Sequence, residues 1–352
     1  MELPVEDNSV APGDRMPASR APNIRDVAKI AGVSYQTVSR VLNDSPNIRE
    51  STRDRVQAAI DQLGYRPNFA ARALATSRSR TIGVLTAAVT TAQYGPATAT
   101  TAIELAAREA GYRVSLTSSP FGDAASMRSS IDYLLHQSVE AIAVIAPQVR
   151  MYEVLEEFDV PVPLVSLAHG IPGHARSLSV DQVTGARLAT RHLIGLGHEE
   201  ILHLAGPQDW IEAEARMQGY LSGLAEADLR TRAPILGDWT ASFGYYAGVE
   251  LLRRPDFTAV FAGNDQMALG FLHACREMKV RVPEDVSVVG FDDIPEAAHF
   301  APPLTTVRQD FAELGRRVID LILAELKGDG HPEPTPIVPE LKIRDSTGRP
   351  GR

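Results

Sequence analysis

Apolar residues near the start of the chain recur at the spacing of a short amphipathic helix. Four of them follow three- and four-residue intervals: Ile24, Val27, Ala28 and Ala31. Asn23 followed by Asp26 resembles a capping box, and Gly32 is placed to end the helix. The pattern therefore predicts a capped helix of about two turns that begins after Asn23.

Two more short helices follow in the same pattern. Ser34 can cap a second helix that continues to Leu42, and a polar, proline-containing turn comes after it. A third helix is expected from about Ser51 to Leu63, with Gly64 as its C-cap. The first part of the chain is thus expected to form a small all-α head.

After residue 80 the pattern changes to short apolar runs that alternate with amphipathic segments. Strands are expected over residues 81–85, 113–117, 141–145, 163–166, 201–205, 259–262, 286–291 and 337–343. Helices are expected over residues 97–110, 126–137, 184–196, 213–226, 242–253, 265–278 and 311–326. This alternation favours parallel sheets covered by helices, and about 260 residues are enough for two such sheets. Ligands of these folds bind at the carboxyl ends of the strands, so an interdomain cleft is the expected ligand site.

The charge of the chain is unevenly distributed. Residues 20–80 carry eleven Arg or Lys and five Asp or Glu, a net charge of +6. The whole chain has a net charge of −9, so the remainder carries −15. A basic head on an acidic body suits contact between the head and DNA phosphates, although a basic stretch is also typical of a solvated surface.

The start of the chain and its single cysteine bear on its location. Residues 1–20 are polar and lack the basic start and apolar core of a secretory signal, so we expect a disordered leader. No apolar run approaches the ~18 residues that span a bilayer. Cys275 has no second cysteine to pair with, which fits a reducing cytoplasm. We therefore expect a cytoplasmic protein.

The second short helix carries side chains suited to a major groove. Gln36 can pair with adenine, Arg40 with guanine, and Tyr35 offers an apolar edge for a thymine methyl. The simpler interpretation is that these side chains lie on a solvated helix. A capped helix and a glycine turn precede them, which favours a helix-turn-helix motif.

Residues 23–43 are similar to the N-terminal signature of the lactose-repressor (LacI/GalR) family of bacterial regulators. The resemblance implies that Tyr35, Gln36 and Arg40 read bases. It also implies a set of residues that contact phosphates: Ser34, Thr37, Ser39 and Asn43. The fold it implies is an all-α helix-turn-helix head followed by an α/β core of the periplasmic-binding-protein type, with two doubly wound parallel-sheet subdomains.

Residues 65–74 resemble the hinge of the same family. A segment this short does not hold as a helix alone in water, so we expect it to fold in the minor groove beside its dimer mate. By the resemblance, Asn68, Ala71 and Leu74 contact DNA, with Leu74 as a wedge that opens the central base step. The alternative for Leu74 is an ordinary buried leucine.

The similarity continues to about residue 344 and implies an effector cleft. The implied cleft residues are Arg216, Trp239, Asn264, Asp292 and Phe311. Asp, Asn and Arg side chains offer the donors and acceptors that sugar hydroxyls require, and an indole offers a flat apolar face.

Each cleft residue has an alternative interpretation. Asp292 and Asp293 could cap a turn or hold a metal, Trp239 could fill the core, and Arg216 could pair with Glu212 or Glu214. Where the lactose repressor has polar cleft residues, this chain has the apolar residues Ile145, Ala146 and Ala168. A sugar or glycoside is the expected effector, with a nucleobase or another metabolite as the alternative.

These observations predict domain boundaries. We expect a leader at 1–20, a DNA-binding head at 21–66, a hinge at 67–80, a core at 81–344 and a flexible tail at 345–352. Within the core, subdomain 1 is expected at about 81–179 plus 311–336, and subdomain 2 at about 180–304 plus 337–344.

The expected function is that of a repressor that binds a pseudo-palindromic operator as a homodimer and is controlled by a small molecule. No leucine heptads that would join dimers follow the last helix. A sugar-transport receptor is one alternative, although the head argues against it. An enzyme of the doubly wound class is another, but we find no Gly-rich phosphate loop, nucleophile elbow or metal cluster. We therefore expect no catalysis, no cofactor and no metal.

Overall fold

The computed structural model describes residues 22–42, 45, 47–66, 73, 78–87, 93–120, 123–146, 148–167, 176–329 and 334–351. These residues belong to two compact units, Met1–Ser79 and Arg80–Arg352. The predicted leader and five residues discussed above lie outside the described residues: Asn43, Asn68, Ala71, Leu74 and Ala168.

The first unit contains three helices, α1 (Ile24–Ala31), α2 (Tyr35–Leu42) and α3 (Glu50–Leu63). The predicted capping box is confirmed: Asn23 accepts from the Asp26 backbone, and the Asn23 backbone N–H donates to the Asp26 carboxylate at 2.9 Å. The glycines after α1 and α3 adopt the left-handed conformation expected of C-caps, with φ of 64° and 58°. The core of this unit takes one fully buried valine from each helix: Val27, Val38 and Val56.

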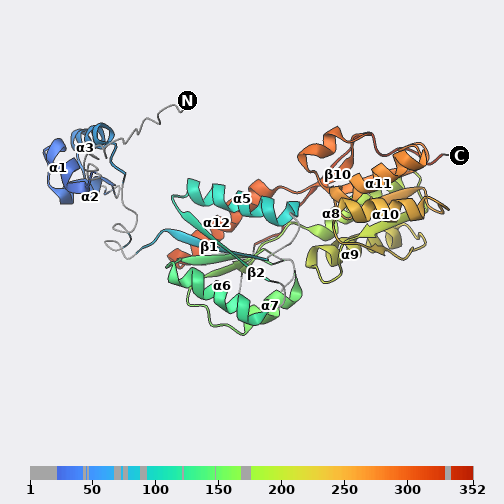
Figure 1. Ribbon diagram of the computed structural model, residues 1–352, viewed down its shortest axis with the longest axis horizontal. Coiled ribbons are helices and arrows are strands. Elements are labelled where there is room, and N and C mark those ends of the chain that lie inside the picture. Colours follow the sequence, from blue (N-terminus) through green and yellow to red (C-terminus); the bar gives the residue numbers. More distant parts are fainter. Residues whose placement is uncertain are drawn as a thin grey trace, which may run out of the picture. The chain divides into compact units, whose positions relative to one another are not determined.

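The second unit contains two sheets. The first has five strands, and we call this sheet together with the helices that pack on it lobe 1 (Figure 1). Its order is β2 (Arg113–Ser119), β1 (Thr81–Ala87), β3 (Ala141–Ile145), β4 (Leu164–Ser166) and β5 (Arg176–Ser177), all parallel. Helices α5 (Tyr94–Glu109) and α12 (Phe311–Lys327) pack on one face. Helices α6 (Ala124–His136) and α7 (Val149–Glu156) pack on the other.

The second sheet has six strands, and we call this sheet together with the helices that pack on it lobe 2. Their order is β11 (Glu340–Lys342), β10 (Thr305–Arg308), β9 (Ser287–Asp292), β8 (Ala259–Ala262), β6 (Ile201–Ala205) and β7 (Ile235–Leu236). All neighbours are parallel except β10 and β11. Helices α8 (Gln182–Gly195) and α9 (Ile211–Glu226) cover one face, and α10 (Ala241–Leu251) and α11 (Asp265–Met278) cover the other. The short helix η1 (Pro295–His299) follows β9.

The chain passes between the lobes three times. The first segment joins β5 to α8, the second joins β10 to α12, and the third returns from α12 to β11. The first and third pair with each other: the Asp181 backbone N–H donates to the Ile337 carbonyl at 2.8 Å, and the Ile337 N–H donates to the Ser179 carbonyl at 2.9 Å. We call these three stretches the crossing segments.

The predicted strands and helices are present with end residues that differ by a few positions. The expected strand at 337–343 is reduced to a single bridge at Ile337 and the strand β11. Helix α7 and strands β5, β7 and β10 were not predicted. Strands β5 and β7 have two residues each, too few to show an alternating pattern.

The predicted flexible tail is wrong for residues 345–351. Ser346 is fully buried, and its hydroxyl donates to the Val288 carbonyl at 2.6 Å and accepts from the Thr305 backbone N–H at 2.8 Å. The backbone of Ser346 also accepts from the Val288 N–H at 2.8 Å. His198 bonds to the Gly348 carbonyl at 2.9 Å. The tail is ordered because it satisfies polar groups at the end of the lobe 2 sheet.

Removal of the Ser346 hydroxyl tests this anchoring. We expect Ser346→Ala to lower the free energy of unfolding by about 1–3 kcal/mol, because it leaves a buried backbone donor and acceptor without partners. The control is Arg349→Ala at an exposed position of the same tail, with an expected change within about 0.5 kcal/mol. Urea unfolding followed by circular dichroism measures both. Equal stability of the two variants would contradict the anchoring.

Candidate functional site

Helix α2 turns an apolar face to the core of the head and a polar face to solvent. Val38 and Val41 are buried, whereas Tyr35, Gln36 and Arg40 are exposed. More than half of the Tyr35 surface is accessible, at 54%. The side chains predicted to read bases therefore project from one short helix, free of packing constraints within this unit.

The predicted phosphate-contacting residues that the structure describes lie at the start of α2 and along it. The Ser34 hydroxyl accepts from the Thr37 backbone N–H at 3.1 Å and lies 2.9 Å from the Thr37 hydroxyl. Ser34 thus caps the helix as predicted and remains exposed, while Thr37 and Ser39 are half-buried. Exposed hydroxyls at a helix N-terminus are suited to bind a phosphate.

The five side chains predicted to form an effector cleft line one pocket. They are Arg216, Trp239, Asn264, Asp292 and Phe311. Strands of both lobes end at this pocket: Ile145 ends β3, Asp292 ends β9, and Asn264 follows β8 closely. This is the edge at which doubly wound sheets bind ligands.

The two lobes contribute walls of different character. Lobe 1 provides mainly apolar side chains, among them Ile145, Leu167 and Leu178, together with the ring of Phe311. Tyr94 meets Phe311 edge-on, with ring centroids 6.0 Å apart. Lobe 2 provides all three charged side chains of the described lining, Glu212, Arg216 and Asp292, and lobe 2 and the crossing segments together provide most of the amide side chains. The apolar lobe 1 wall agrees with the expectation drawn from Ile145 and Ala146.

Arg216 is buried and almost fully engaged. Its Nη2 lies 3.3 Å from the Asp292 carboxylate, its Nε donates to Gln182 at 2.9 Å, and its Nη1 donates to the Gly263 carbonyl. The guanidinium carbon lies 3.8 Å from the centroid of the Phe291 ring. The ion pair of Arg216 is thus with Asp292 and not with the neighbours on its own helix.

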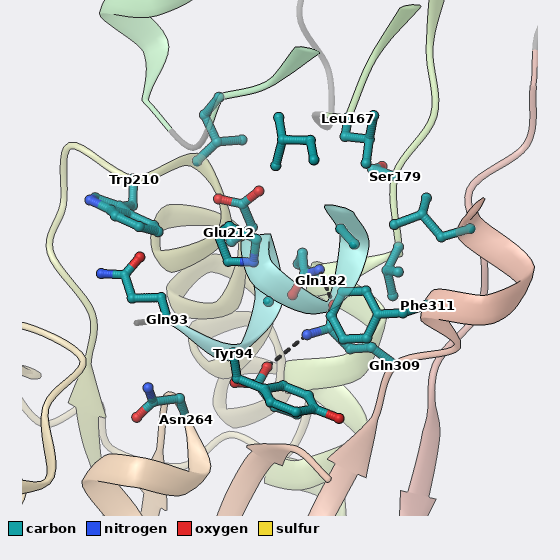
Figure 2. A pocket seen from close by; sticks show the side chains of 18 of the residues that line it. Gln93, Tyr94, Leu167, Ser179, Gln182, Trp210, Glu212, Asn264, Gln309 and Phe311 are labelled. Atoms are coloured by element: carbon teal, nitrogen blue, oxygen red, sulfur yellow. Dashed lines mark hydrogen bonds between the residues drawn. The ribbon is translucent and has the colours of Figure 1, made fainter. Parts of the chain in front are cut away.

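Two glutamines close a ring of hydrogen bonds around this ion pair. Gln309 donates to Asp292 at 2.7 Å, and Gln182 donates to Gln309 at 2.8 Å (Figure 2). Because Gln182 also accepts from Arg216, the four side chains form a closed circuit. Gln182 ends the first crossing segment, and Gln309 lies in the second. The Arg216–Asp292 ion pair is therefore hydrogen-bonded directly to two of the crossing segments.

Burial and hydrogen bonding act in opposite directions on Asp292. Burial raises the pKa of its carboxyl, while Arg216 and Gln309 lower it. The residue also has a positive φ of 113°, which a β-branched or bulky side chain would disfavour. The alternative in which Asp292 and Asp293 hold a metal finds no support, because Asp293 instead pairs with Arg344 at 2.6 Å. No group of three potential metal ligands occurs among the described residues.

The backbone of Gly206 lies against the indole ring of Trp239 and restricts its position. The Trp239 φ of 70° is unusual for a large side chain, and a Cβ added to Gly206 would lie 2.1 Å from the indole Cζ2. Trp210, which was not predicted, meets Trp239 edge-on with ring centroids 5.9 Å apart. Both indoles therefore present rigid apolar surface to the pocket.

Asn264 has a structural role in addition to its place in the pocket. Its side-chain oxygen accepts from the Met267 backbone N–H at 2.9 Å and caps α11, and its amide donates to the Trp239 carbonyl at 3.0 Å. One further donor and one further lone pair remain on this amide for a ligand.

Several polar pocket residues were missed in the sequence: Gln93, Tyr94, Gln182, Glu212 and Gln309. None of them stands out by its type or spacing. Glu212 and Gln309 lie close in sequence to Arg216 and Phe311, and that nearness was the only available signal.

Glu212 differs from the other charged groups of the pocket because its Oε2 is buried without a hydrogen-bond partner. Burial raises the pKa of its carboxyl from 4.5 to about 7, while its own backbone N–H and Arg216 act in the opposite direction. The ionised carboxylate is therefore destabilised by its surroundings.

This pKa shift predicts a pH-dependent effect of Glu212→Gln on stability. Between the unfolded and folded pKa values the folded state binds more protons, so the parent protein loses stability as the pH rises through this window. We expect the variant to gain about 1–3 kcal/mol relative to the parent at about pH 8, and much less at about pH 5. Urea unfolding at both pH values measures the difference.

The control for this measurement is Glu214→Gln, an exposed position on the same helix. Its effect should stay within about 0.5 kcal/mol at both pH values. A gain for Glu212→Gln that does not grow with pH would contradict the assignment of an unpaired carboxylate.

In the part of the chain that the structure describes, no helix is long and apolar enough to cross a bilayer.

Two family models match the chain. Residues 23–68 match bacterial regulatory proteins of the lacI family, and residues 190–347 match a periplasmic binding protein-like domain.

Curated relatives cover most of the chain. The transcriptional regulator GalS of Salmonella typhimurium is 39% identical over 309 residues, 87% of this chain and 90% of GalS. The lactose operon repressor of Escherichia coli is 34% identical over 307 residues, 86% of this chain and 84% of the repressor. The regulator CelR of Thermobifida fusca is 35% identical over 348 residues, 94% of this chain and all of CelR.

Solved structures agree with these relatives. The lac repressor dimer bound to operator and the anti-inducer ONPF superposes with a TM-score of 0.80 at 33% identity, covering 94% of this chain and 100% of that chain. The CelR–cellobiose complex gives 0.67 at 32% identity, covering 92% and 99%. With both a matching head and relatives of this coverage, the chain belongs to the lacI family of bacterial regulatory proteins.

Proposed function

We propose that this lacI-family regulator is a repressor that binds its operator through α2 and is controlled by a small sugar or glycoside in the pocket of the second unit. The observation that carries the DNA-binding part is the exposed face of α2, where Tyr35, Gln36 and Arg40 project from a helix fixed by its own small core. The similar proteins include a lactose operon repressor and a CelR–cellobiose complex, which supports a sugar as the effector.

The roles of individual DNA-contacting residues are part of this proposal. Tyr35, Gln36 and Arg40 are assigned to base edges. Ser34, Thr37, Ser39 and Asn43 are assigned to phosphates, and Asn68, Ala71 and Leu74 to the minor groove. Asn43 and the three hinge residues lie outside the described residues, so their assignment rests on the sequence resemblance.

The roles of the pocket residues follow from their chemistry. Arg216, Asn264 and Asp292 retain hydrogen-bonding capacity for hydroxyl groups, while Trp239 and Phe311 offer apolar faces to a sugar ring. Glu212, Gln93 and Trp210 are added to the sequence-based set because they line the same pocket.

The proposed domain division is a head at 21–66, a hinge at 67–80 and a core at 81–344. The core extends to at least residue 348 because Ser346 and Gly348 are bonded to lobe 2. Control by the effector requires that it bind the two functional states with different affinity. A coupling of about 1–3 kcal/mol would change operator affinity about 5- to 150-fold.

We also infer that the chain acts as a homodimer in the cytoplasm and has no catalytic activity. A pseudo-palindromic operator requires two heads. Lobe 2 carries a surface hollow lined mainly by residues of α10 and α11, both apolar and polar, where Tyr246 is 71% exposed and Leu269 is 41% exposed. Large apolar side chains gathered in this way are suited to bind a second copy of the chain.

Substitution of the α2 face tests DNA reading directly. A preferred duplex is first selected from a random library with the full chain, and its affinity is compared with that of an unselected duplex by fluorescence anisotropy. We expect Gln36→Ala and Arg40→Ala each to reduce this preference about 5- to 150-fold, because each paired base contact contributes about 1–3 kcal/mol. The matched control is Gln62→Ala at an exposed position of α3. Folded variants that discriminate as well as the parent would refute the assignment of α2.

A charge placed in the lobe 2 hollow tests the dimer. We expect Leu269→Glu to weaken self-association at least about tenfold. Burial of the new charge at the interface need raise the free energy of association by only about 1.4 kcal/mol for this effect. Leu236→Glu is the control, because Leu236 is 56% exposed on the edge strand β7 and lies outside the hollow. Analytical ultracentrifugation measures both. A Leu269 variant as dimeric as the control would show that the dimer forms through another surface.

A further inference from the structure

The formal charges that line the pocket do not cancel. Among the described lining residues, three side chains carry a charge: Glu212, Arg216 and Asp292. Arg216 and Asp292 neutralise each other at 3.3 Å. Above about pH 7, where its carboxyl is ionised, Glu212 therefore leaves the described lining residues with one uncompensated negative charge.

The Glu212 carboxylate is also an unused acceptor. Figure 2 shows it directed into the space that the labelled pocket side chains surround. Its Oε2 is buried and bonds to no other group of the chain. Burial of an unpaired acceptor costs free energy that a ligand donor can recover. A ligand hydroxyl placed here would be bound by an oxygen that has no competing partner.

Two other buried polar atoms around the pocket lack partners in the same way. The Gln93 side-chain oxygen is an acceptor, and the Trp239 indole N–H is a donor. The unused set is therefore two acceptors and one donor. Hydroxyl groups both donate and accept, so a polyhydroxylated ligand can satisfy all three.

Among the described lining residues Arg216 is the single cation, and its charge is already balanced by Asp292. Arg216 donates to Asp292, Gln182 and the Gly263 carbonyl, and one face of its guanidinium lies on the Phe291 ring. An anionic group that approaches Arg216 therefore meets a guanidinium whose charge is already balanced, and it meets the Glu212 carboxylate in the same pocket. Within a water-excluded pocket the repulsion between two like charges is strong.

We propose that Glu212 is the residue that selects an uncharged saccharide over its acidic counterpart, by accepting hydrogen bonds from sugar hydroxyls and repelling carboxylates. This inference rests on the proposed sugar response and adds the charge class of the effector and the residue that sets it. Selection by an unfavourable charge is a common route to specificity.

Intrinsic fluorescence provides the binding measurement, because both tryptophans of the chain line the pocket. The full chain is titrated at about pH 8, where the Glu212 carboxyl is mainly ionised, with three matched pairs: glucose and glucuronate, galactose and galacturonate, and phenyl β-glucoside and phenyl β-glucuronide. We expect at least one neutral member to bind, and its acidic counterpart to bind at least about tenfold more weakly. This comparison needs no variant.

Glu212→Gln assigns the selectivity to one side chain. The amide keeps the size and the acceptor oxygen but removes the charge. We expect the neutral-to-acidic affinity ratio to fall at least about fivefold in this variant, and to stay unchanged in Glu214→Gln, an exposed neighbour on the same helix.

The results separate the inference from the proposed function. If the parent binds a neutral sugar and its uronate equally well, or if Glu212→Gln leaves the ratio unchanged, the inference is wrong while a sugar-controlled regulator stands. If the parent binds no member of any pair, the proposed sugar effector and this inference are both overturned.

Discussion

Arg216 and Asp292 form a buried ion pair on which the polar half of the pocket depends. Taking two charges out of water is costly, and their mutual attraction offsets this only when further hydrogen bonds satisfy the remaining donors and acceptors. Here Gln182, Gln309 and the Gly263 carbonyl supply those bonds. Since Gln182 and Gln309 belong to two crossing segments, the bonds that stabilise the ion pair also join the pocket to the connections between the lobes.

The two walls of the pocket therefore differ in the kind of ligand group that each can bind. The lobe 1 wall is apolar and packs against a ring face or an apolar substituent, while the lobe 2 wall holds the groups that determine polarity and charge. A ligand that touches both walls can stabilise one relative arrangement of the lobes over another, and such a difference in affinity between two states is the physical requirement for control by a ligand. The crossing segments are the covalent route by which such a change passes between the lobes.

Local signals in the sequence are sufficient for most elements of the fold, but not for α7, β5, β7 and β10. The Asn23 and Asp26 capping box and the glycine C-caps of the head follow from contacts within a few residues, and the buried strands follow from short apolar runs in the sequence. The same is true of the exposed face of α2. The five cleft residues were placed together by the family resemblance, not by physical reasoning from their positions.

Long-range polar contacts could not be predicted. Gln182 and Gln309 are 127 positions apart, and nothing in either local sequence indicates that they bond. Ser346 lies in a stretch of Gly, Pro and Thr that is typical of a flexible tail, yet it satisfies backbone groups of β9 and of the first residue of β10. Glu212 was considered only as a partner for Arg216, because the competing partner Asp292 lies 76 positions away.

A double-mutant cycle on the ion pair is the most direct measurement of this account. The variants are Arg216→Met, Asp292→Asn and their combination, compared by urea unfolding. If the pair and its hydrogen-bond circuit act as one unit, each single substitution costs about 3–5 kcal/mol and the double variant costs at least about 1.5 kcal/mol less than the sum. Costs that add to within about 0.5 kcal/mol would show that the two residues act independently and would contradict the account.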